Sequence, residues 1–383
     1  MSALTFESRA AATVSEPVKV RSEFYRPELD LLRFIAFFSV FLCHGIGFAQ
    51  KIPLLVRLGL QSGMCLFFTL SSYLITELLL RERQKTGRVH VKAFFIRRIL
   101  RIWPLYFGCL SLAVLTGIVV RSMWFPRLAL FMYLVLIGNW YNVLIGPIHS
   151  PWQPLWSINL EEQFYLLWPF LARIKVAFLW MVSLATFPVA AAALVYWCGK
   201  VHDGPYGMPI WFNSLVQFQY FGLGAILALV LRGRLPKLRL PLRAALAISS
   251  VAFFCVAASV LIAGDARTPG SLIGGYLLID CACLALFLSL LGLERRFVPT
   301  WGVNLGKISY GLYVFHNPCL TFVWLALSRN AFIRTHHTVH GCLDLLFAFV
   351  VTYSLAKLSN QYFEAPFLRL KKRFELVKSR PVD

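Results

Sequence analysis

This chain is short of charged residues, and of acidic ones in particular. Only 14% of its 383 residues are charged, against about 25% in an average soluble domain. It has 17 Asp and Glu against 38 Lys and Arg, and 58% of its residues are hydrophobic. This composition excludes a large soluble core and predicts a polytopic membrane protein. The net charge of +21 does not point to nucleic acid, because the cations gather in short segments between apolar runs, as the positive-inside rule requires.

Paired cysteines and internal repeats are also missing. The nine cysteines form no CxxC pair and lie almost entirely within apolar runs, which excludes a disulfide framework and a zinc site and favours small reduced hydrophobic side chains. No repeat, low-complexity stretch or linker divides the chain. We therefore expect a single all-helical membrane domain over 26–373, preceded by a flexible cytoplasmic tail (1–25) and followed by a short cytoplasmic tail (374–383).

Eleven apolar runs are long enough to span a membrane, and an odd number would place the two termini on opposite sides. Six basic segments hold 29 of the 38 Lys and Arg residues, and all six can be cytoplasmic only if one run between 102 and 158 does not cross. We select the run 128–146, since it ends in GNWYNVLIGP, a sequence that suits a re-entrant or interfacial segment. The prediction is about ten transmembrane helices with both termini cytoplasmic. The basic, amphipathic C-terminal stretch is expected along the inner leaflet.

Two ionisable residues lie within the first apolar run, LLRFIAFFSVFLCHGIGFA. Arg33 precedes His44 by eleven positions, so both side chains share one helix face, with Cα atoms about 16 Å apart. Ionisable groups in a span are costly and usually face a bundle interior or a polar cavity. Asp30 lies three residues before Arg33 and is expected to pair with it.

Five local patterns carry a family resemblance. They are RPELDLLRFIAFFSVFLCH, FFTLSSYLITELLL, FFIRRILRIWPLYF, PLWSINLEEQFYLLWP, and the pair ISYGLYVFHNP and FEAPF. Together they resemble the acyltransferase 3 family, integral membrane O-acyltransferases that modify sugars on bacterial surface polysaccharides and related molecules. The family's Arg and His in the first span fall on Arg33 and His44, and its R-x-x-R pattern falls on Arg98 and Arg101. Its W-S-x-x-x-E-E-Q-F-Y signature falls on 156–165.

The resemblance implies an enzyme of the bacterial inner membrane. It would move an acyl group, most simply acetyl, from acyl-CoA to a hydroxyl of a carbohydrate or lipid-linked glycan, with acetyl-CoA as co-substrate and no permanently bound cofactor or metal. His44 would be the general base on the acceptor hydroxyl, direct acylation of His44 being the alternative. Arg33 would hold part of the donor or orient polar groups, or only snorkel and pair with Asp30. Two rival functions stay open: a transporter or flippase for a lipid-linked sugar, and an inactive scaffold of a polysaccharide assembly complex.

Three arginines follow the second span, namely Arg97, Arg98 and Arg101. Positive-inside topology explains their charge, but guanidinium groups also bind phosphate oxygens in bidentate geometry, as the phosphates of coenzyme A would require. Arg98 and Arg101 are three residues apart and share a helix face. We expect all three to bind the donor.

The remaining site candidates lie in the tryptophan-rich signature and near the C-terminal end. Asn159 followed by Glu162 resembles a helix capping box. That leaves Glu161 to orient His44 or contact the acceptor. Ser157, Glu162 and Tyr165 are further candidates, although a tyrosine here also suits a membrane interface. His316 precedes a proline within a span and is expected to hydrogen-bond a broken helix turn, or else to act in catalysis. The HHTVH segment at 336–340 is interpreted as a solvated outer loop.

Overall fold

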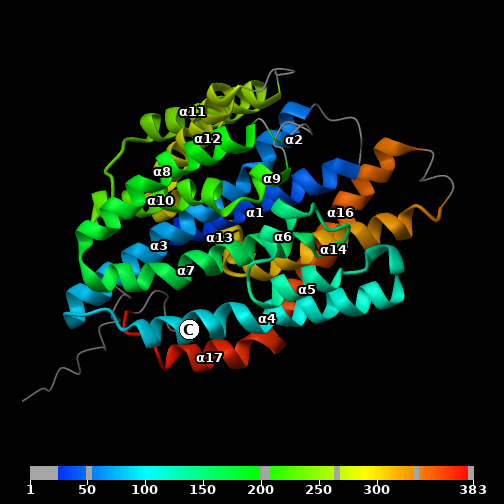
Figure 1. Cartoon of the computed structure of the whole chain (residues 1–383), viewed down its shortest axis with the longest axis horizontal. Coiled ribbons are helices and arrows are strands. Elements are labelled where there is room, and N and C mark those ends of the chain that lie inside the picture. Colours follow the sequence, from blue (N-terminus) through cyan, green and yellow to red (C-terminus); the bar gives the residue numbers. More distant parts are fainter. Residues whose placement is uncertain are drawn as a thin grey trace, which may run out of the picture.

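The computed structural model describes residues 25–48, 54–198, 200, 208–262, 268–330 and 336–377. Every regular element within these ranges is helical (Figure 1). The predicted all-α membrane fold is therefore confirmed. Residues 1–24 and 378–383, where the sequence predicts the two tails, lie outside the described residues.

Seven segments of the described chain are long and apolar enough to cross a membrane. They contain α3 (Gly63–Thr86), α4 (Val91–Val119), α8 (Val176–Cys198), α10 (Ser214–Leu231), α11 (Leu240–Ile262), α12 (Pro269–Leu290) and α16 (His337–Leu358). Three further helices are of comparable length: α1 (Pro27–Phe48), α7 (Trp156–Ile174) and α14 (Ser309–Leu327), with 22, 19 and 19 residues. These three helices carry Arg33, Glu161 and His316, which are candidate site residues.

The run 128–146 is broken into two short helices, as its sequence predicted. α5 (Arg127–Leu134) has eight residues and α6 (Gly138–Leu144) has seven, and each is about 12 Å long or less. Leu136 between them has a φ of +63°, a left-handed conformation that ends a helix. Neither helix can cross a hydrocarbon layer of about 30 Å.

The helices run roughly parallel to the long axis of the molecule, with α3 near its centre (Figure 1). Of the 18-residue apolar stretch that marks each span, 72% is buried for the segment with α3, against 39% for α4 and 22% for α11. α3 packs against α10 so closely that a Cβ on Gly224 would lie 2.1 Å from the Thr69 carbonyl oxygen. The core therefore gathers around α3, whereas α4 and α11 expose apolar faces of the kind that lipid covers.

The start of α1 is held by the short helix α13 (Thr300–Lys307). The apolar run 304–327, one of the eleven, is divided at Ile308 into α13 and α14. A Cβ on Gly306 would lie 1.8 Å from the Asp30 carbonyl oxygen, so only glycine permits this contact. The backbone that carries Asp30 and Arg33 is thus fixed from outside by α13.

The C-terminal amphipathic stretch packs against the protein. α16 continues through a π-helical turn (Ser359–Glu364) into α17 (Ala365–Lys372). α17 lies alongside the first half of α4 (Figure 1). The remaining short helices are α2 (Leu54–Gln61) and α9 (Met208–Trp211).

Candidate active site

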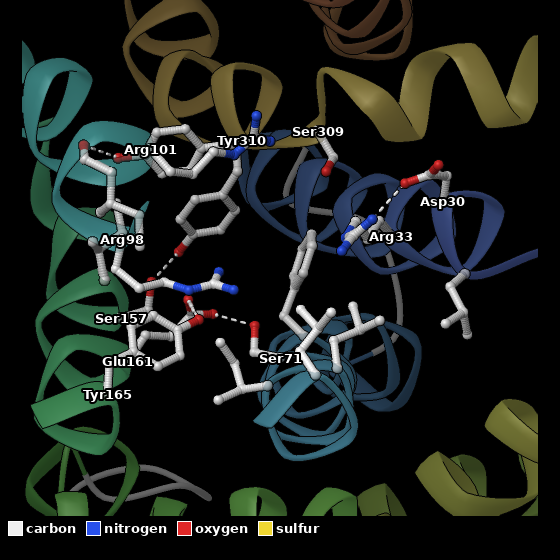
Figure 2. Close-up of a pocket in the computed structure, with 18 of the residues that line it drawn as sticks. Asp30, Arg33, Ser71, Arg98, Arg101, Ser157, Glu161, Tyr165, Ser309 and Tyr310 are labelled. Atoms are coloured by element: carbon white, nitrogen blue, oxygen red, sulfur yellow. Dashed lines mark hydrogen bonds and ion pairs between the residues drawn. The ribbon is translucent and has the colours of Figure 1, made fainter. Parts of the chain in front are cut away.

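A large polar cavity lies between α1, α3, α4, α7 and α14, with Lys371 of α17 also in its lining (Figure 2). It encloses about 1330 Å³ of atom-free space, its open mouth included. Its lining runs from Tyr25 and Arg26, just before α1, to Tyr313 and Ser157. The lining combines apolar side chains with several charged and hydroxyl groups, as in a small-molecule binding site.

Positive charge dominates the lining of this cavity. Five cationic side chains face two carboxylates, Asp30 and Glu161; the cations are Arg26, Arg33, Arg98, Arg101 and Lys371. The predicted ion pair between Arg33 and Asp30 is present and lies at the cavity wall (Figure 2). Arg26 is placed near Glu77, with 3.9 Å between its Nη2 and Oε1. Among the described residues, the cavity cations without an ion pair therefore lie on α4.

Arg98 and Arg101 share the cavity face of α4, as their spacing predicted. Neither makes a hydrogen bond to any residue that the structure describes, and the buried Nε of Arg98 is unsatisfied. The Arg98 guanidinium carbon lies 5.6 Å from the centre of the Phe94 ring and 5.5 Å from that of Tyr165, distances typical of cation–π contacts. Two guanidinium groups thus present free donors to the cavity.

The third arginine of the segment, Arg97, points elsewhere. Its Nη2 pairs with Glu82 at 2.8 Å and its Nη1 donates to the Phe374 carbonyl at 2.8 Å. It does not line the cavity. The structure thus gives Arg97 partners other than those expected of a donor-binding residue.

Glu161 forms a hydrogen-bonded group with two neighbours in the cavity wall (Figure 2). Ser71 Oγ donates to its Oε1 at 3.1 Å, and Tyr165 Oη donates to its Oε2 at 2.7 Å. Glu162, in contrast, accepts a bond of 3.0 Å from Trp103 Nε1. The hydrogen-bond partners of Glu161 among the described residues are Ser71 and Tyr165, while that of His44 is His316.

The predicted capping box is wrong. α7 begins at Trp156, which places Asn159 inside the helix, fully buried. Its Oδ1 accepts from the Gly138 amide at 2.7 Å, and its Nδ2 donates to Tyr106 Oη at 2.7 Å and to the Leu155 carbonyl at 3.0 Å. Asn159 therefore joins α7 to α4 and to the first residue of α6.

His44 is paired with His316. His44 Nδ1 lies 2.8 Å from His316 Nε2, with the two rings nearly parallel. The Nδ1 of His316 in turn contacts the carbonyl oxygen of Tyr313, one turn earlier in α14. Neither histidine lines the cavity. The shared helix face of Arg33 and His44 thus places one residue in the cavity and the other beyond its end.

Tyr313 links the cavity wall to the histidine pair. Its hydroxyl lies 2.7 Å from Ser157 Oγ and donates to the Pro154 carbonyl at 3.1 Å. Tyr313 and Ser157 both line the cavity, while the backbone of Tyr313 holds His316. One residue of α14 is therefore shared by both parts of the site.

Sequence reasoning missed Tyr313, Lys371 and Glu364. Tyr313 and Glu364 lie in motifs used for the resemblance, YGLYVFHNP and FEAPF. The sequence around each is also typical of an ordinary transmembrane span, so nothing singled them out. Glu364 is buried at the end of the π-helical turn and acts electrostatically on Arg101. Lys371 had only the signal of a basic amphipathic stretch, which also describes a lipid-facing helix.

The HHTVH segment differs from the predicted solvated loop. α16 begins at His337, and His340 is 2% exposed, its ring stacked on that of Trp324 with 3.7 Å between centroids. Of the side chains described in this segment, His336 and Val339 are exposed. Within the described ranges no group of three or more His, Cys, Asp or Glu side chains could hold a metal ion.

Comparison with known proteins identifies relatives along nearly the whole chain. A Staphylococcus aureus protein with the provisional name O-acetyltransferase is 27% identical over 374 residues, covering 90% of this chain and 57% of the relative. A Bacillus subtilis protein, YrhL, provisionally named as a peptidoglycan O-acetyltransferase, is 27% identical over 378 residues, or 91% of this chain and 56% of that protein. The peptidoglycan O-acetyltransferase OatA of Listeria monocytogenes is 30% identical over 158 residues, or 38% and 24%.

This chain spans little more than half the length of the relatives that it matches along most of its sequence. No solved structure is similar to it at a significant level. The family pattern described as an acyltransferase domain matches residues 26–357, a range that contains every candidate site residue named from the sequence. With that match, the chain belongs to the acyltransferase 3 family.

Proposed function

We propose that the protein is a membrane-embedded O-acyltransferase that moves an acetyl group from acetyl-CoA to a hydroxyl of a carbohydrate acceptor. The observation that carries the proposal is the pairing of a cationic cavity with a histidine relay on the far side of Tyr313. Family membership and the names of the relatives support O-acetyl transfer. The acceptor class follows from the relatives named for peptidoglycan.

The donor would occupy the cavity, which we place at the cytoplasmic side of a bacterial inner membrane. Arg98 and Arg101 offer guanidinium donors that no described residue satisfies. A buried guanidinium without an acceptor is unfavourable, and phosphate oxygens satisfy it in bidentate geometry. The thioester end of the donor would then lie toward Tyr313 and Ser157. Arg33, paired with Asp30, would shape the wall between these two ends.

Hydrogen bonding assigns the proton positions in the histidine relay. The Tyr313 carbonyl can only accept, so the Nδ1 of His316 carries a proton and its Nε2 is left with a lone pair. That lone pair accepts from the Nδ1 of His44, which places the free lone pair of His44 on its Nε2. His44 is thereby prepared as a general base.

In the transfer step the Nε2 of His44 would remove the proton from the acceptor hydroxyl as its oxygen attacks the thioester carbonyl. The carbon–oxygen bond forms, the carbon–sulfur bond breaks, and the proton passes from His44 to the leaving thiolate. His316 would orient His44 and stabilise its cationic form through the shared hydrogen bond, since a second imidazole can accept from it. The products are the O-acetylated sugar and free coenzyme A.

Purified protein in lipid nanodiscs, given radiolabelled acetyl-CoA and soluble peptidoglycan fragments, tests the proposal. We expect acceptor-dependent release of free thiol with transfer of label to the glycan. His44→Ala should abolish both, whereas His149→Ala, a matched change at an exposed position, should leave both intact. A thiol signal that is the same with and without acceptor, in all three proteins, would refute the proposed function.

A further inference from the structure

One cation in the cavity lining lies outside the region that matches the family. Lys371 is in α17, fourteen positions beyond residue 357, where the match ends. Its Nζ lies 3.2 Å from Glu375 Oε1, and its side chain is 24% exposed. Lys371 is therefore a partly open, charged element of the cavity that the family pattern does not include.

The chain just after Lys371 is fastened to the bundle at two points. The Phe374 carbonyl accepts from Arg97, which is itself held by Glu82 of α3. The Leu376 carbonyl accepts from Lys85 Nζ at 3.3 Å. These bonds fix the segment against α3 and α4, so that Lys371 has a defined position beside the arginines of α4.

Three like charges meet where α17 passes α4. Lys371 is near enough to Arg101 and Arg98 for their charges to act on it. Glu375 forms an ion pair with Lys371, while Arg98 and Arg101 make no ion pair to any described residue. Such a cluster repels itself, and an anion with several negative oxygens relieves that repulsion. The site is thus built for more negative charge than a single carboxylate supplies.

We propose that Lys371 is a specificity-determining residue that binds a terminal phosphomonoester of a nucleotide thioester donor, while Arg98 and Arg101 bind its diphosphate. This inference rests on the proposed function. The division follows from side-chain chemistry: planar guanidinium forks suit the bridged oxygens of a diphosphate, whereas an ammonium is a compact, hydrated point charge that suits a partly exposed dianion. In coenzyme A that dianion is the 3′-phosphate of the ribose.

Nucleotide binding tests the inference without acyl transfer. Adenosine 3′,5′-bisphosphate and adenosine 5′-monophosphate differ only in the 3′-phosphate, and their dissociation constants are measured by calorimetry on the full chain in nanodiscs. Lys371→Gln should weaken bisphosphate binding about tenfold, the effect of one charge-assisted hydrogen bond at a partly exposed site. Binding of the monophosphate should change less than twofold. Lys371→Arg, which keeps the charge, should retain most of the bisphosphate affinity.

Lys372→Gln is the matched control, since Lys372 is the next residue of α17 but is exposed and does not line the cavity. It should behave as the wild type does. Equal weakening of both nucleotides by Lys371→Gln, or the same effect from Lys372→Gln, would overturn the inference. So would a wild-type protein that does not distinguish the two nucleotides.

Turnover with acetyl-CoA and with its 3′-dephospho form separates this inference from the proposed function. If Lys371→Gln raises the KM for acetyl-CoA alone, both stand. Transfer that does not depend on Lys371 would overturn only the inference. Lys371-dependent nucleotide binding without any acetyl transfer would overturn only the proposed function.

Discussion

Replacing Asn159 by Asp distinguishes a buried helix junction from a helix cap. At an N-cap, Asp and Asn are about equally favourable, so a cap would tolerate the change. In the structure Asn159 is fully buried and its Nδ2 donates to Tyr106 Oη and to the Leu155 carbonyl. Aspartate has nearly the same shape and keeps the bond from the Gly138 amide, but it cannot donate to either acceptor as a carboxylate.

The expected loss is about 3 kcal/mol of unfolding free energy. Each of the two lost hydrogen bonds contributes about 1 kcal/mol. A buried carboxylate oxygen that faces the Tyr106 hydroxyl and the Leu155 carbonyl adds a desolvation penalty of about 1 kcal/mol more. The unfolding entropy is about 2.1 cal/mol/K per residue. For a chain of 383 residues, the loss corresponds to a fall in Tm of about 4 °C.

The cysteines of the chain supply the assay. A thiol-reactive fluorophore reports unfolding when buried thiols become accessible, and five are buried: Cys43, Cys65, Cys109, Cys283 and Cys319. Asn304→Asp in α13 is the control, because Asn304 is exposed. If the Asn159→Asp protein has the same Tm as the Asn304→Asp control, the hydrogen bonds of Asn159 contribute nothing to the free energy of unfolding, and the capping interpretation would be restored.

Three further predictions follow from the site. Arg101→Ala should raise the apparent KM for acetyl-CoA about tenfold. Arg101→Lys should recover only part of the lost affinity, since an ammonium group lacks the two-pronged donor geometry of a guanidinium. Equal KM values in the wild type and both variants would mean that Arg101 serves topology alone. His316→Ala should reduce kcat by a factor of roughly 10² or more while the protein still inserts normally. His316→Gln, which can donate to the Tyr313 carbonyl and accept from His44, should keep a measurable part of the wild-type kcat. Full activity in the alanine variant would remove the histidine relay from the mechanism. In a cysteine-free background, Trp124→Cys and His149→Cys should both react with a membrane-impermeant thiol reagent added from the outer side. Labelling of His149→Cys only after permeabilisation would mean that the segment between the two positions crosses the membrane.

The helices could be predicted from the sequence because a span leaves a strong signal. A run of about twenty apolar residues has few other uses. The sequence GNWYNVLIGP marks a run that forms two short helices and no long one. All nine cysteines are free, and five of them are buried. What failed was local: Asn159 and Glu162 have the spacing of a capping box, yet α7 begins three residues earlier.

The partners within the site could be predicted only in part. The Asp30–Arg33 pair follows from helical spacing and is present. The contact between His44 and His316 joins residues 272 positions apart, and no periodicity encodes which helices pack together. The same limit applies to His340, whose polar neighbours in the sequence indicate solvent although Trp324 covers its ring. Arg97 belonged to the right arginine cluster, but its place on α4 directs it to the C-terminal segment.

The position of Tyr313 in the cavity wall has a consequence for the permeability of the membrane. An enzyme that takes two polar substrates from opposite sides needs polar space on both sides of one point, and joined polar space in a membrane conducts protons and ions. The hydroxyl of Tyr313 contacts Ser157 and the Pro154 carbonyl at the cavity wall, and its backbone carbonyl contacts His316; under the proposed function it would keep the two spaces apart. Under the proposed function, the residue that aligns the chemistry is also the electrical seal, so loosening it would dissipate the proton gradient as well as slow acetyl transfer.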